Sequence, residues 1–219
     1  VLSGSQHLLR IDSEMDEPLT TLDRKALQNH IADLITECDL IIFEDYDKGS
    51  LDNEIITSTI SQASKAGKIT AVDPKKRNFL SYVGCTLFKP NLKEMREGLG
   101  IAVDPTQIKS LKAGVDKLNE TLHAEHALIT LSEHGVYYQS AKTNGKLPAH
   151  LRSIADVSGA GDTVISIAAL ALAAGLPLAT VAELANLGGG IVCESPGVVP
   201  IDLARLKEEA RAEGIFNNK

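Results

Sequence analysis

Short apolar runs rich in strand-forming residues alternate with amphipathic stretches along this chain, and this alternation restricts the fold more than any other feature. The runs lie at residues 40–43, 69–72, 86–88 and 127–131. Each is almost wholly apolar, which is typical of strands buried on both faces of a parallel sheet. Stretches with one apolar helical face separate the runs. The order strand–helix–strand predicts an open α/β sheet with right-handed crossovers.

Capping signals and apolar spacing place the other elements. Thr20 lies three positions before an acidic residue and is typical of a helix N-cap. Asp104–Pro105 predicts a cap followed by proline in the first helical position, and Gly67 is expected to end a helix in the left-handed conformation. An antiparallel pair is predicted around residues 136–138, with its turn at Asn144–Gly145. The expected helices include residues 22–35, 108–122, 160–174, 179–193 and 201–212.

The composition predicts a soluble cytoplasmic protein. Of the 219 residues, 43% are hydrophobic and 23% charged, which is typical of a globular domain. The chain has no apolar run of about 18 residues and no visible signal peptide, so we expect no membrane span and no secretion. The net charge of −7, without a basic tract, disfavours nucleic acid as a partner. The three cysteines are scattered without metal-ligand spacing and are interpreted as reduced thiols.

A glycine turn that opens an apolar helix is the strongest functional signal. Gly159, Ala160 and Gly161 allow the backbone to approach a ligand closely, and Asp162 follows them at the start of the helix. The unpaired amides at a helix N-terminus favour an anion such as a transferring phosphoryl group. A carboxylate beside such an anion is suited to accept a proton from an attacking hydroxyl. The alternative is that Asp162 only caps the helix and the glycines only turn the chain.

Residues 156–162, with the sequence Asp-Val-Ser-Gly-Ala-Gly-Asp, resemble the C-terminal signature of the ribokinase-like (PfkB) carbohydrate kinases. Segments 89–94, 130–135 and 185–192 are similar to other elements of that family and follow in the same order. The resemblance implies a three-layer α/β/α sandwich with a mainly parallel sheet, and ATP with Mg²⁺ as cofactors. It implies that Asp162 is the catalytic base, and that the amides of Gly159, Ala160 and Gly161 hold the γ-phosphate.

The same resemblance implies a nucleotide side of the site. Its expected residues are Lys89, Asn91, Glu94, Thr130, Gly135, Asn186 and Gly190, and Glu94 is also expected to contact the metal through water. Local sequence alone favours another interpretation of Asn91 and Glu94, in which they form a helix capping box. Close helix–sheet packing is the alternative for Gly190. Asp156 and residues 194–197 also suit a monovalent cation.

Two segments narrow the resemblance to the heptose-7-phosphate kinases. Residues 44–49 and 72–75 are similar to elements of that subfamily, and residues 7–12 resemble the strand that leaves its lid. The implied reaction phosphorylates the anomeric hydroxyl of D-glycero-β-D-manno-heptose 7-phosphate on the route to ADP-heptose and lipopolysaccharide. The implied substrate-binding residues are Asp45, Lys48, Asp73 and Lys75. Another sugar, a sugar phosphate or a nucleoside remains an alternative substrate, and a nucleotide-binding fragment without transfer remains an alternative function.

The chain is interpreted as one kinase core over residues 1–219, the C-terminal part of a PfkB domain, with residues 1–12 as the remnant of a lid strand. The first strands of the family's sheet, its glycine-rich sugar-binding motif and most of its lid have no counterpart in this sequence. We therefore expect exposed core or a partner chain. Because the lid is a common dimer surface in the family, we expect a homodimer for the full-length protein.

Overall fold

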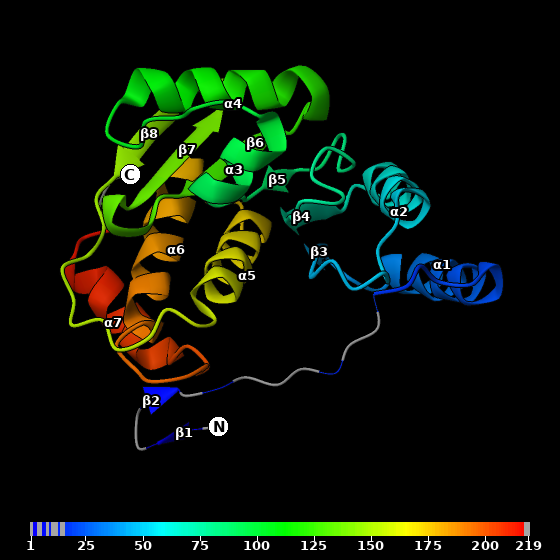
Figure 1. Ribbon diagram of the computed structural model, residues 1–219. Helices are drawn as coiled ribbons and strands as arrows, with labels where there is room; N and C mark the ends of the chain where they lie inside the picture. Colours follow the sequence, from blue (N-terminus) through cyan, green and yellow to red (C-terminus); the bar gives the residue numbers. More distant parts are fainter. Residues whose placement is uncertain (1, 4–5, 8, 10–12, 14–15, 217–219) are drawn as a thin grey trace.

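The computed structural model describes residues 2–3, 6–7, 9, 13 and 16–216. Its main sheet follows the strand order β3-β4-β5-β6-β7-β8, with β3 at one edge and β8 at the other. Strands β3 to β6 run parallel, and β7 and β8 are antiparallel to their neighbours (Figure 1). The strands are β3 (Leu40–Glu44), β4 (Ile69–Asp73), β5 (Leu87–Phe88), β6 (His126–Thr130), β7 (Val136–Ser140) and β8 (Asn144–Leu147). The predicted, mainly parallel sheet is confirmed.

Helices cover both faces of this sheet because neighbouring strand residues point to opposite sides. Ala71 and Leu87 pack against α5, α6 and α7, whereas Val72 and Phe88 pack against the face covered by α2 and α4. The helices are α1 (Thr21–Ile35), α2 (Asn53–Lys65), α3 (Leu92–Leu99), α4 (Ile108–Leu122), α5 (Ala160–Ala173), α6 (Leu178–Val192) and α7 (Leu203–Ala212). The predicted three-layer α/β/α sandwich is therefore confirmed (Figure 1).

The register of the parallel strands positions the polar residues that follow them. Glu44 at the end of β3 is the direct neighbour of Asp73 at the end of β4. Helix α5 packs across β3 and β4. In such sheets, ligands bind beyond the carboxyl ends of the strands. The residues at this edge are therefore the candidates for a ligand-binding or active site.

Two of the predicted helix ends are confirmed and one is wrong. The Thr20 hydroxyl accepts the Asp23 N–H at 3.2 Å and caps α1, and Gly67 adopts φ +67° just after α2. Helix α4 begins at Ile108, three residues after the proline that was expected to start it. The Asp104 carboxylate instead accepts the N–H of Thr106 at 2.9 Å, which forms a separate turn ahead of the helix.

The predicted turn at Asn144–Gly145 is also wrong, because both residues belong to β8. The connection between β7 and β8 is closed earlier, where the Ser140 hydroxyl accepts the N–H groups of Lys142 and Thr143 at 3.2 Å each. Gly145 has another use. A Cβ atom there would lie 2.5 Å from the Tyr138 hydroxyl, so glycine permits this close contact between paired strands.

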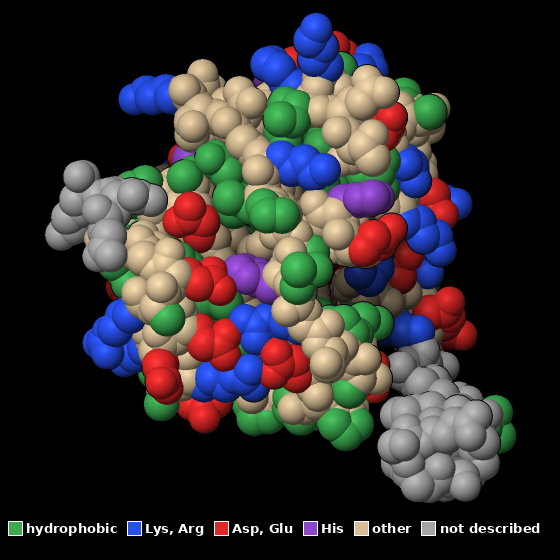
Figure 2. Space-filling view, turned by 90° about the vertical axis from the view of Figure 1, so that its left-hand side faces the viewer, with side chains coloured by type: hydrophobic (Ala, Val, Ile, Leu, Met, Phe, Trp, Pro, Cys, Tyr) green, Lys and Arg blue, Asp and Glu red, His purple; other side chains and the backbone are tan. Residues whose placement is uncertain are grey.

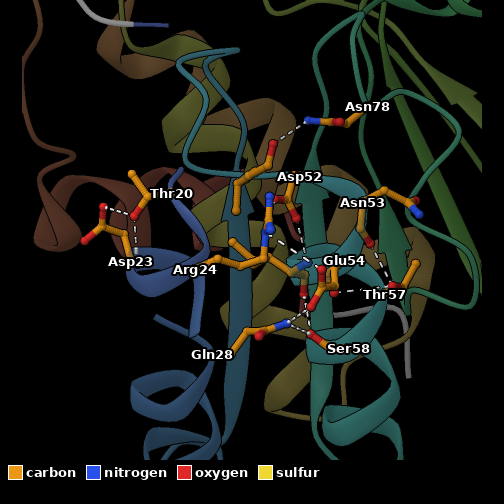
Figure 3. A network of polar contacts seen from close by, with 12 residues as sticks. Thr20, Asp23, Arg24, Gln28, Asp52, Asn53, Glu54, Thr57, Ser58 and Asn78 are labelled. Atoms are coloured by element: carbon orange, nitrogen blue, oxygen red, sulfur yellow. Dashed lines mark hydrogen bonds and ion pairs between the residues drawn. The ribbon is translucent and has the colours of Figure 1, made fainter. Parts of the chain in front are cut away.

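Helix α1 is joined to α2 mainly by polar contacts, with Ile35 its one fully buried residue. Figure 3 shows the junction, in which the Arg24 guanidinium lies 2.6 Å from the carboxylate of Asp52. Asp52 is the N-cap of α2, and Gln28 donates to Glu54 at 3.2 Å. The start of α2 is therefore fixed together with the first half of α1.

The expected lid strand over residues 1–12 falls largely outside the described residues. Within the described part, β1 (Leu2–Ser3) pairs antiparallel with β2 (Gln6–His7). Cys38, Cys85 and Cys193 are free thiols. Among the described helices, none is long and apolar enough to cross a membrane.

Candidate active site

Three carboxylates converge at the carboxyl edge of the sheet. Glu44 and Asp73 end adjacent strands, and Asp162 lies in the first turn of α5. One oxygen of each lies within 4.8 Å of the others. Like charges at this distance are unfavourable unless nearby cations or bound ligands balance them. The negative charge at this edge therefore favours the binding of a cation or of a hydrogen-bond donor.

A buried ion pair lies beneath the glycine turn. The Lys89 ammonium is 2.9 Å from the Asp73 carboxylate, and both side chains are almost fully buried. Burial raises the pKa of Asp73, and the charge of Lys89 opposes that shift. A Cβ at Gly161 would lie 3.5 Å from Asp73 Oδ2 and 3.8 Å from Lys89 Nζ, so the turn rests directly on the pair. The structure thus brings together three predicted residues: Asp73 at the end of β4, Lys89 directly after β5, and Gly161 in α5.

The N-terminus of α5 presents backbone donors next to these charges. Gly159 is the N-cap residue and adopts φ +78°, a conformation that favours glycine. The first helical bond is donated by Thr163 to Gly159 O at 3.0 Å, which leaves the N–H groups of Gly161 and Asp162 without an intrahelical acceptor. The N-cap residue is a glycine, which has no side chain to cap the helix, and Asp162 is the acidic residue of the first turn. The arrangement forms an anion hole with a carboxylate beside it.

Tyr46, which follows β3, lies near the carboxylates of this edge. Burial, followed by the charges of Asp162 and Glu44, raises the pKa of Tyr46. Burial together with the negative charges of Asp73 and Asp162 raises the pKa of Glu44 to about 7. Glu44 and Tyr46 therefore belong to the site although neither was predicted there.

Asp45, which was predicted to bind the sugar, is buried and bonded to residues of a distant loop. It is 3% exposed, and its Oδ2 accepts the Tyr82 hydroxyl at 2.7 Å and the Asn78 amide at 3.1 Å. Alternate residues of an extended strand point in opposite directions, so Glu44 and Tyr46 lie on one side and Asp45 on the other. This alternation is the sequence signal from which the positions of Glu44 and Tyr46 could have been predicted. Lys48 is exposed in the following turn.

The residues of the predicted nucleotide side partly cluster here. Asn91 and Glu94 form the capping box of α3, with both bonds at 2.8 Å, as the local interpretation expected. Glu94 also binds the Lys75 ammonium at 2.7 Å. Burial opposes the charge of Lys75, but Glu94 and then Asp73 outweigh burial and raise its pKa. Asn91 forms a β-bridge with Thr130, which brings the end of β6 to the same edge.

A family model confirms what the glycine turn indicated. Residues 14–203 match the model described as "pfkB family carbohydrate kinase". The chain belongs to this family. As in the predicted signature, the family match contains the glycine turn, Asp162 and the Asn91–Glu94 element.

Individual relatives agree with the family match. The chain is 37% identical to "Bifunctional protein HldE" of Methylobacillus flagellatus over 97% of its own length and 43% of that protein. It is 39% identical to "Bifunctional protein HldE" of Caulobacter vibrioides over 94% of its own length and 42% of that protein. The chain thus spans less than half the length of these curated relatives.

Solved structures support the fold. Phosphofructokinase-2 from Escherichia coli in complex with potassium matches with a TM-score of 0.79 at 16% identity, over 90% of this chain and 64% of that chain. The ribokinase of Arabidopsis thaliana complexed with ribose and ATP matches with a TM-score of 0.70 at 15% identity, over 88% and 59%. At these identities, the likeness shows that this pfkB-family chain has the ribokinase-like fold.

Asn186 and Gly190 form a second group on α6. The Asn186 amide donates to Pro148 O at 2.9 Å, and a Cβ at Gly190 would lie 3.1 Å from Arg152 Nε. A cavity of about 220 Å³ lies beside Asn186, with His150 and Glu183 among its lining residues. A Cβ at Gly190 would therefore press on the loop residue Arg152, and the predicted nucleotide contact of Gly190 stays a prediction.

Gly135 is likewise required by packing. It adopts φ +84°, and a Cβ there would lie 2.0 Å from the carbonyl oxygen of Leu147. The Asp156 carboxylate joins two loops, since it accepts the Ser158 N–H at 2.9 Å and the Gly197 N–H at 3.0 Å. These are the loops on which a monovalent cation was expected.

The donor chemistry at the edge of the sheet fits the magnesium ion that the family implies. Glu44, Asp73 and Asp162 offer hard oxygen ligands, which Mg²⁺ prefers. Glu94 has one oxygen bonded to Lys75 and the other to the N–H of Asn91, and its predicted contact with a metal through water stays a prediction.

Proposed function

We propose that this chain carries the phosphoryl-transfer site of an ATP-dependent sugar kinase, with Asp162 as its catalytic base. The observation that carries the proposal is the position of Asp162, a carboxylate in the first turn of α5, where the N–H groups of Gly161 and Asp162 have no intrahelical acceptor. A hydroxyl placed there meets a proton acceptor and faces a phosphoryl group held by the backbone.

In the proposed reaction, the acceptor oxygen forms a bond to the γ-phosphorus of ATP. The bond from that phosphorus to the bridging oxygen breaks, and ADP leaves. The hydroxyl proton passes to the Asp162 carboxylate. The N–H groups of Gly159, Gly161 and Asp162 are the proposed donors to the γ-phosphate, whereas the Ala160 N–H, also predicted for this role, donates to Val157 O at 3.3 Å. Asn91 and Thr130 are proposed to lie toward the nucleotide. Phosphoryl transfer depends mainly on alignment and charge stabilisation, and this arrangement supplies both.

Magnesium bound with the nucleotide would neutralise phosphate charge. Glu44 and Asp73 directly, and Glu94 through water, are the residues that would hold it. The Lys89–Asp73 pair keeps the Asp73 carboxylate in place at the edge of the sheet. Lys75 is fixed by Glu94 and directs a second positive charge to the same edge, where it can pair with a phosphate of either substrate.

For the acceptor, we propose D-glycero-β-D-manno-heptose 7-phosphate, which would yield the 1,7-bisphosphate. The similarity of residues 44–49 and 72–75 to the heptose-7-phosphate kinases supports this choice. The curated relatives at 37% and 39% identity share the name "Bifunctional protein HldE". The proposed assembly is a homodimer in the cytoplasm, with a monovalent cation near Asp156; potassium is present in the structure of phosphofructokinase-2 from Escherichia coli.

Phosphorus NMR tests the proposal directly. The full-length protein that carries this chain is incubated with Mg-ATP and heptose 7-phosphate, with ribose, fructose 6-phosphate and adenosine as competing acceptors in parallel. We expect a new anomeric phosphate signal from the heptose, and faster turnover of it than of the other acceptors. Faster turnover of another acceptor would overturn the substrate, and ATP binding without any transfer would overturn the kinase itself.

A further inference from the structure

Arg152 lies in the middle of the loop between β8 and α5, and the proposed reaction gives it no part. Its side chain is 9% exposed, with Nη1 at 2.7 Å from the Glu194 carboxylate and Nη2 bonded to Glu209 on α7. The other four side chains of residues 151–155 are exposed, although two of them are large and apolar. Arg152 is therefore the one side chain of this stretch that anchors the loop to the rest of the molecule.

The Arg152 side chain is seated against the backbone of α6 at Gly190. A Cβ atom at Gly190 would lie 3.1 Å from Arg152 Nε and 3.2 Å from its Cδ, closer than an ordinary contact. This Nε is buried and has no hydrogen-bond partner. Buried ion pairs often contribute no more to stability than apolar side chains of the same size, and an unpaired buried donor lowers the contribution further. A need to hold the loop in one position explains this residue better than stability alone.

The second half of the loop is bonded to the segment that follows α6. Cys193 O accepts the N–H groups of Ala155 at 2.9 Å and Asp156 at 3.2 Å, and the Asp156 carboxylate accepts the Gly197 N–H at 3.0 Å. Glu194, the partner of Arg152, belongs to the same segment. Because the side chain and the backbone bonds join the loop to one segment, a change at Arg152 should shift the approach to the glycine turn.

Both ends of this loop reach residues that are predicted to contact the nucleotide. At its start, Pro148 O accepts the Asn186 amide at 2.9 Å, and His150 lines the cavity beside Asn186. At its end lies Gly159, the N-cap of α5, where the proposed donors to the γ-phosphate begin. The position of one loop therefore sets the separation of these two regions.

We infer that Arg152, seated against Gly190, is a positioning residue for the nucleotide: it holds the loop so that the glycine turn and the cavity beside Asn186 keep the separation that ATP requires. This inference rests on the proposed function, in which the glycine turn binds the γ-phosphate. Arg152 acts through the loop and touches neither substrate. Its loss should weaken the binding of ATP and leave the binding of the sugar, which the loops after β3 and β4 are proposed to supply, unchanged.

The test measures kcat, KM for ATP and KM for heptose 7-phosphate of the full-length protein and of its Arg152→Ala variant, at a temperature at which both are folded. We expect KM for ATP to rise by roughly tenfold, the effect of losing about one hydrogen bond to a charged group, while KM for the sugar changes less than about twofold. Arg205→Ala is the matched control, because Arg205 binds the same two carboxylates from α7 and its loss leaves the loop anchored. Both of its KM values should stay within about twofold of the parent.

Gly190→Ala displaces Arg152 without removing it. The added methyl group presses on Nε and Cδ of Arg152, so KM for ATP should rise in this variant as well. In an Arg152→Ala background there is no long side chain to displace, and Gly190→Ala should cause no further rise. Losses that multiply in the double variant would show that the two residues act separately and would overturn the inference.

The inference and the proposed function fail in different ways. A parent without kinase activity contradicts both. An active parent whose Arg152→Ala variant keeps KM for ATP within about twofold contradicts the inference alone, and so does an equal rise in both KM values. A fall in kcat with both KM values unchanged indicates loss of folded enzyme only and also overturns the inference. If Arg152→Ala does not fold, Arg152→Lys takes its place; it keeps the charge without the paired donors and should raise KM for ATP about threefold or more.

Discussion

At the scale of single residues, the site is a balance between acidic and basic groups at one edge of a sheet. Three carboxylates, from Glu44, Asp73 and Asp162, converge there, and Lys89 is the ammonium in direct contact with one of them. A buried carboxylate without its partner is costly, because neither water nor another charge compensates it. The lysine therefore matters to folding as well as to the site.

Replacement of Lys89 by methionine should destabilise the protein strongly. It leaves Asp73 buried without its 2.9 Å partner, and such losses amount to about 3–5 kcal/mol. Lys93→Met is the control, because Lys93 is 82% exposed and its pair on α3 is loose at 3.9 Å. Urea unfolding should show the large loss only for Lys89→Met. A loss below 1 kcal/mol, or one that Asp73→Asn fails to relieve in the double variant, would contradict this account.

Glu44 should make stability depend on pH in a direction opposite to that of most carboxylates. Its pKa is raised from 4.5 to about 7, so the folded protein binds this proton more tightly than the unfolded chain. The free energy of unfolding should therefore fall as pH rises from 4.5 to about 7, and then level off. Glu44→Gln removes this contribution.

Unfolding in metal-free buffer at pH 5 and pH 8 measures the effect. The stability of Glu44→Gln relative to the parent should be greater at pH 8 than at pH 5. Glu208→Gln on α7 changes an exposed carboxyl and should show the same difference from the parent at both values. An equal difference for Glu44→Gln at both pH values would show that burial does not disfavour the Glu44 charge.

At the scale of elements, the ends of helices and strands set the positions of the functional groups. Asp52 is both the N-cap of α2, where it accepts the Ile55 N–H at 2.9 Å, and the partner of Arg24 on α1. The cap satisfies a backbone donor that no other group would satisfy, whereas the ion pair is partly exposed to water. The cap should therefore contribute more to stability.

Asp52→Ala should cost about 1–2 kcal/mol of unfolding free energy, the usual loss for a helix cap combined with a weak ion pair. Arg24→Ala should cost less than Asp52→Ala, because only the partly exposed pair is lost. Chemical denaturation of both variants gives the order. A larger loss for Arg24→Ala would mean that the ion pair between Arg24 and Asp52 contributes more to stability than the N-cap of α2.

The elements were largely predictable because their signals are local. The four parallel strands and the helices α5, α6 and α7 were placed within about two residues, since each carries its own apolar pattern. The turn at Asn144–Gly145 was missed because Ser140 and Tyr138, on the paired strand, decide where that hairpin turns. The burial of Asp45 was not predictable, because its partners, Asn78 and Tyr82, lie more than thirty residues away in the sequence.

At the scale of the whole molecule, a charged network fixes the loop that leads to the glycine turn. Arg152 in this loop binds Glu194 after α6, at 2.7 Å, and also Glu209 on α7. Arg205 binds the same two carboxylates. The Arg152 side chain is only 9% exposed, so this network is poorly screened by water. This network could not be predicted from the sequence, because its members come from three separate parts of the chain.

Arg152→Met should therefore affect the protein more than Arg205→Met. The first change removes two charge-assisted bonds from a buried position and should cost roughly 1–3 kcal/mol. The second changes a side chain that is 40% exposed and should cost about 0–1 kcal/mol, because Arg152 still satisfies both carboxylates. Equal losses in thermal unfolding would show that the two arginines are interchangeable.

The surface charge is otherwise mixed. On the face shown in Figure 2, acidic and basic side chains are interspersed, and no broad field of one sign forms there. The net charge of −7 therefore does not concentrate on this face. For the proposed sugar-phosphate substrate, Lys75, whose side chain is 37% exposed at the edge of the sheet, is placed to provide local attraction.

The most direct test of the account is the kcat of Asp162→Asn in the full-length protein, with saturating Mg-ATP and heptose 7-phosphate. Asparagine keeps the shape of the side chain but cannot take the proton. The account predicts a loss of about 10²–10⁴-fold in kcat, with ATP affinity little changed, while the exposed control Asp33→Asn on α1 keeps full activity. An Asp162→Asn variant that turns over at the parent rate would contradict the central claim that this carboxylate is the catalytic base.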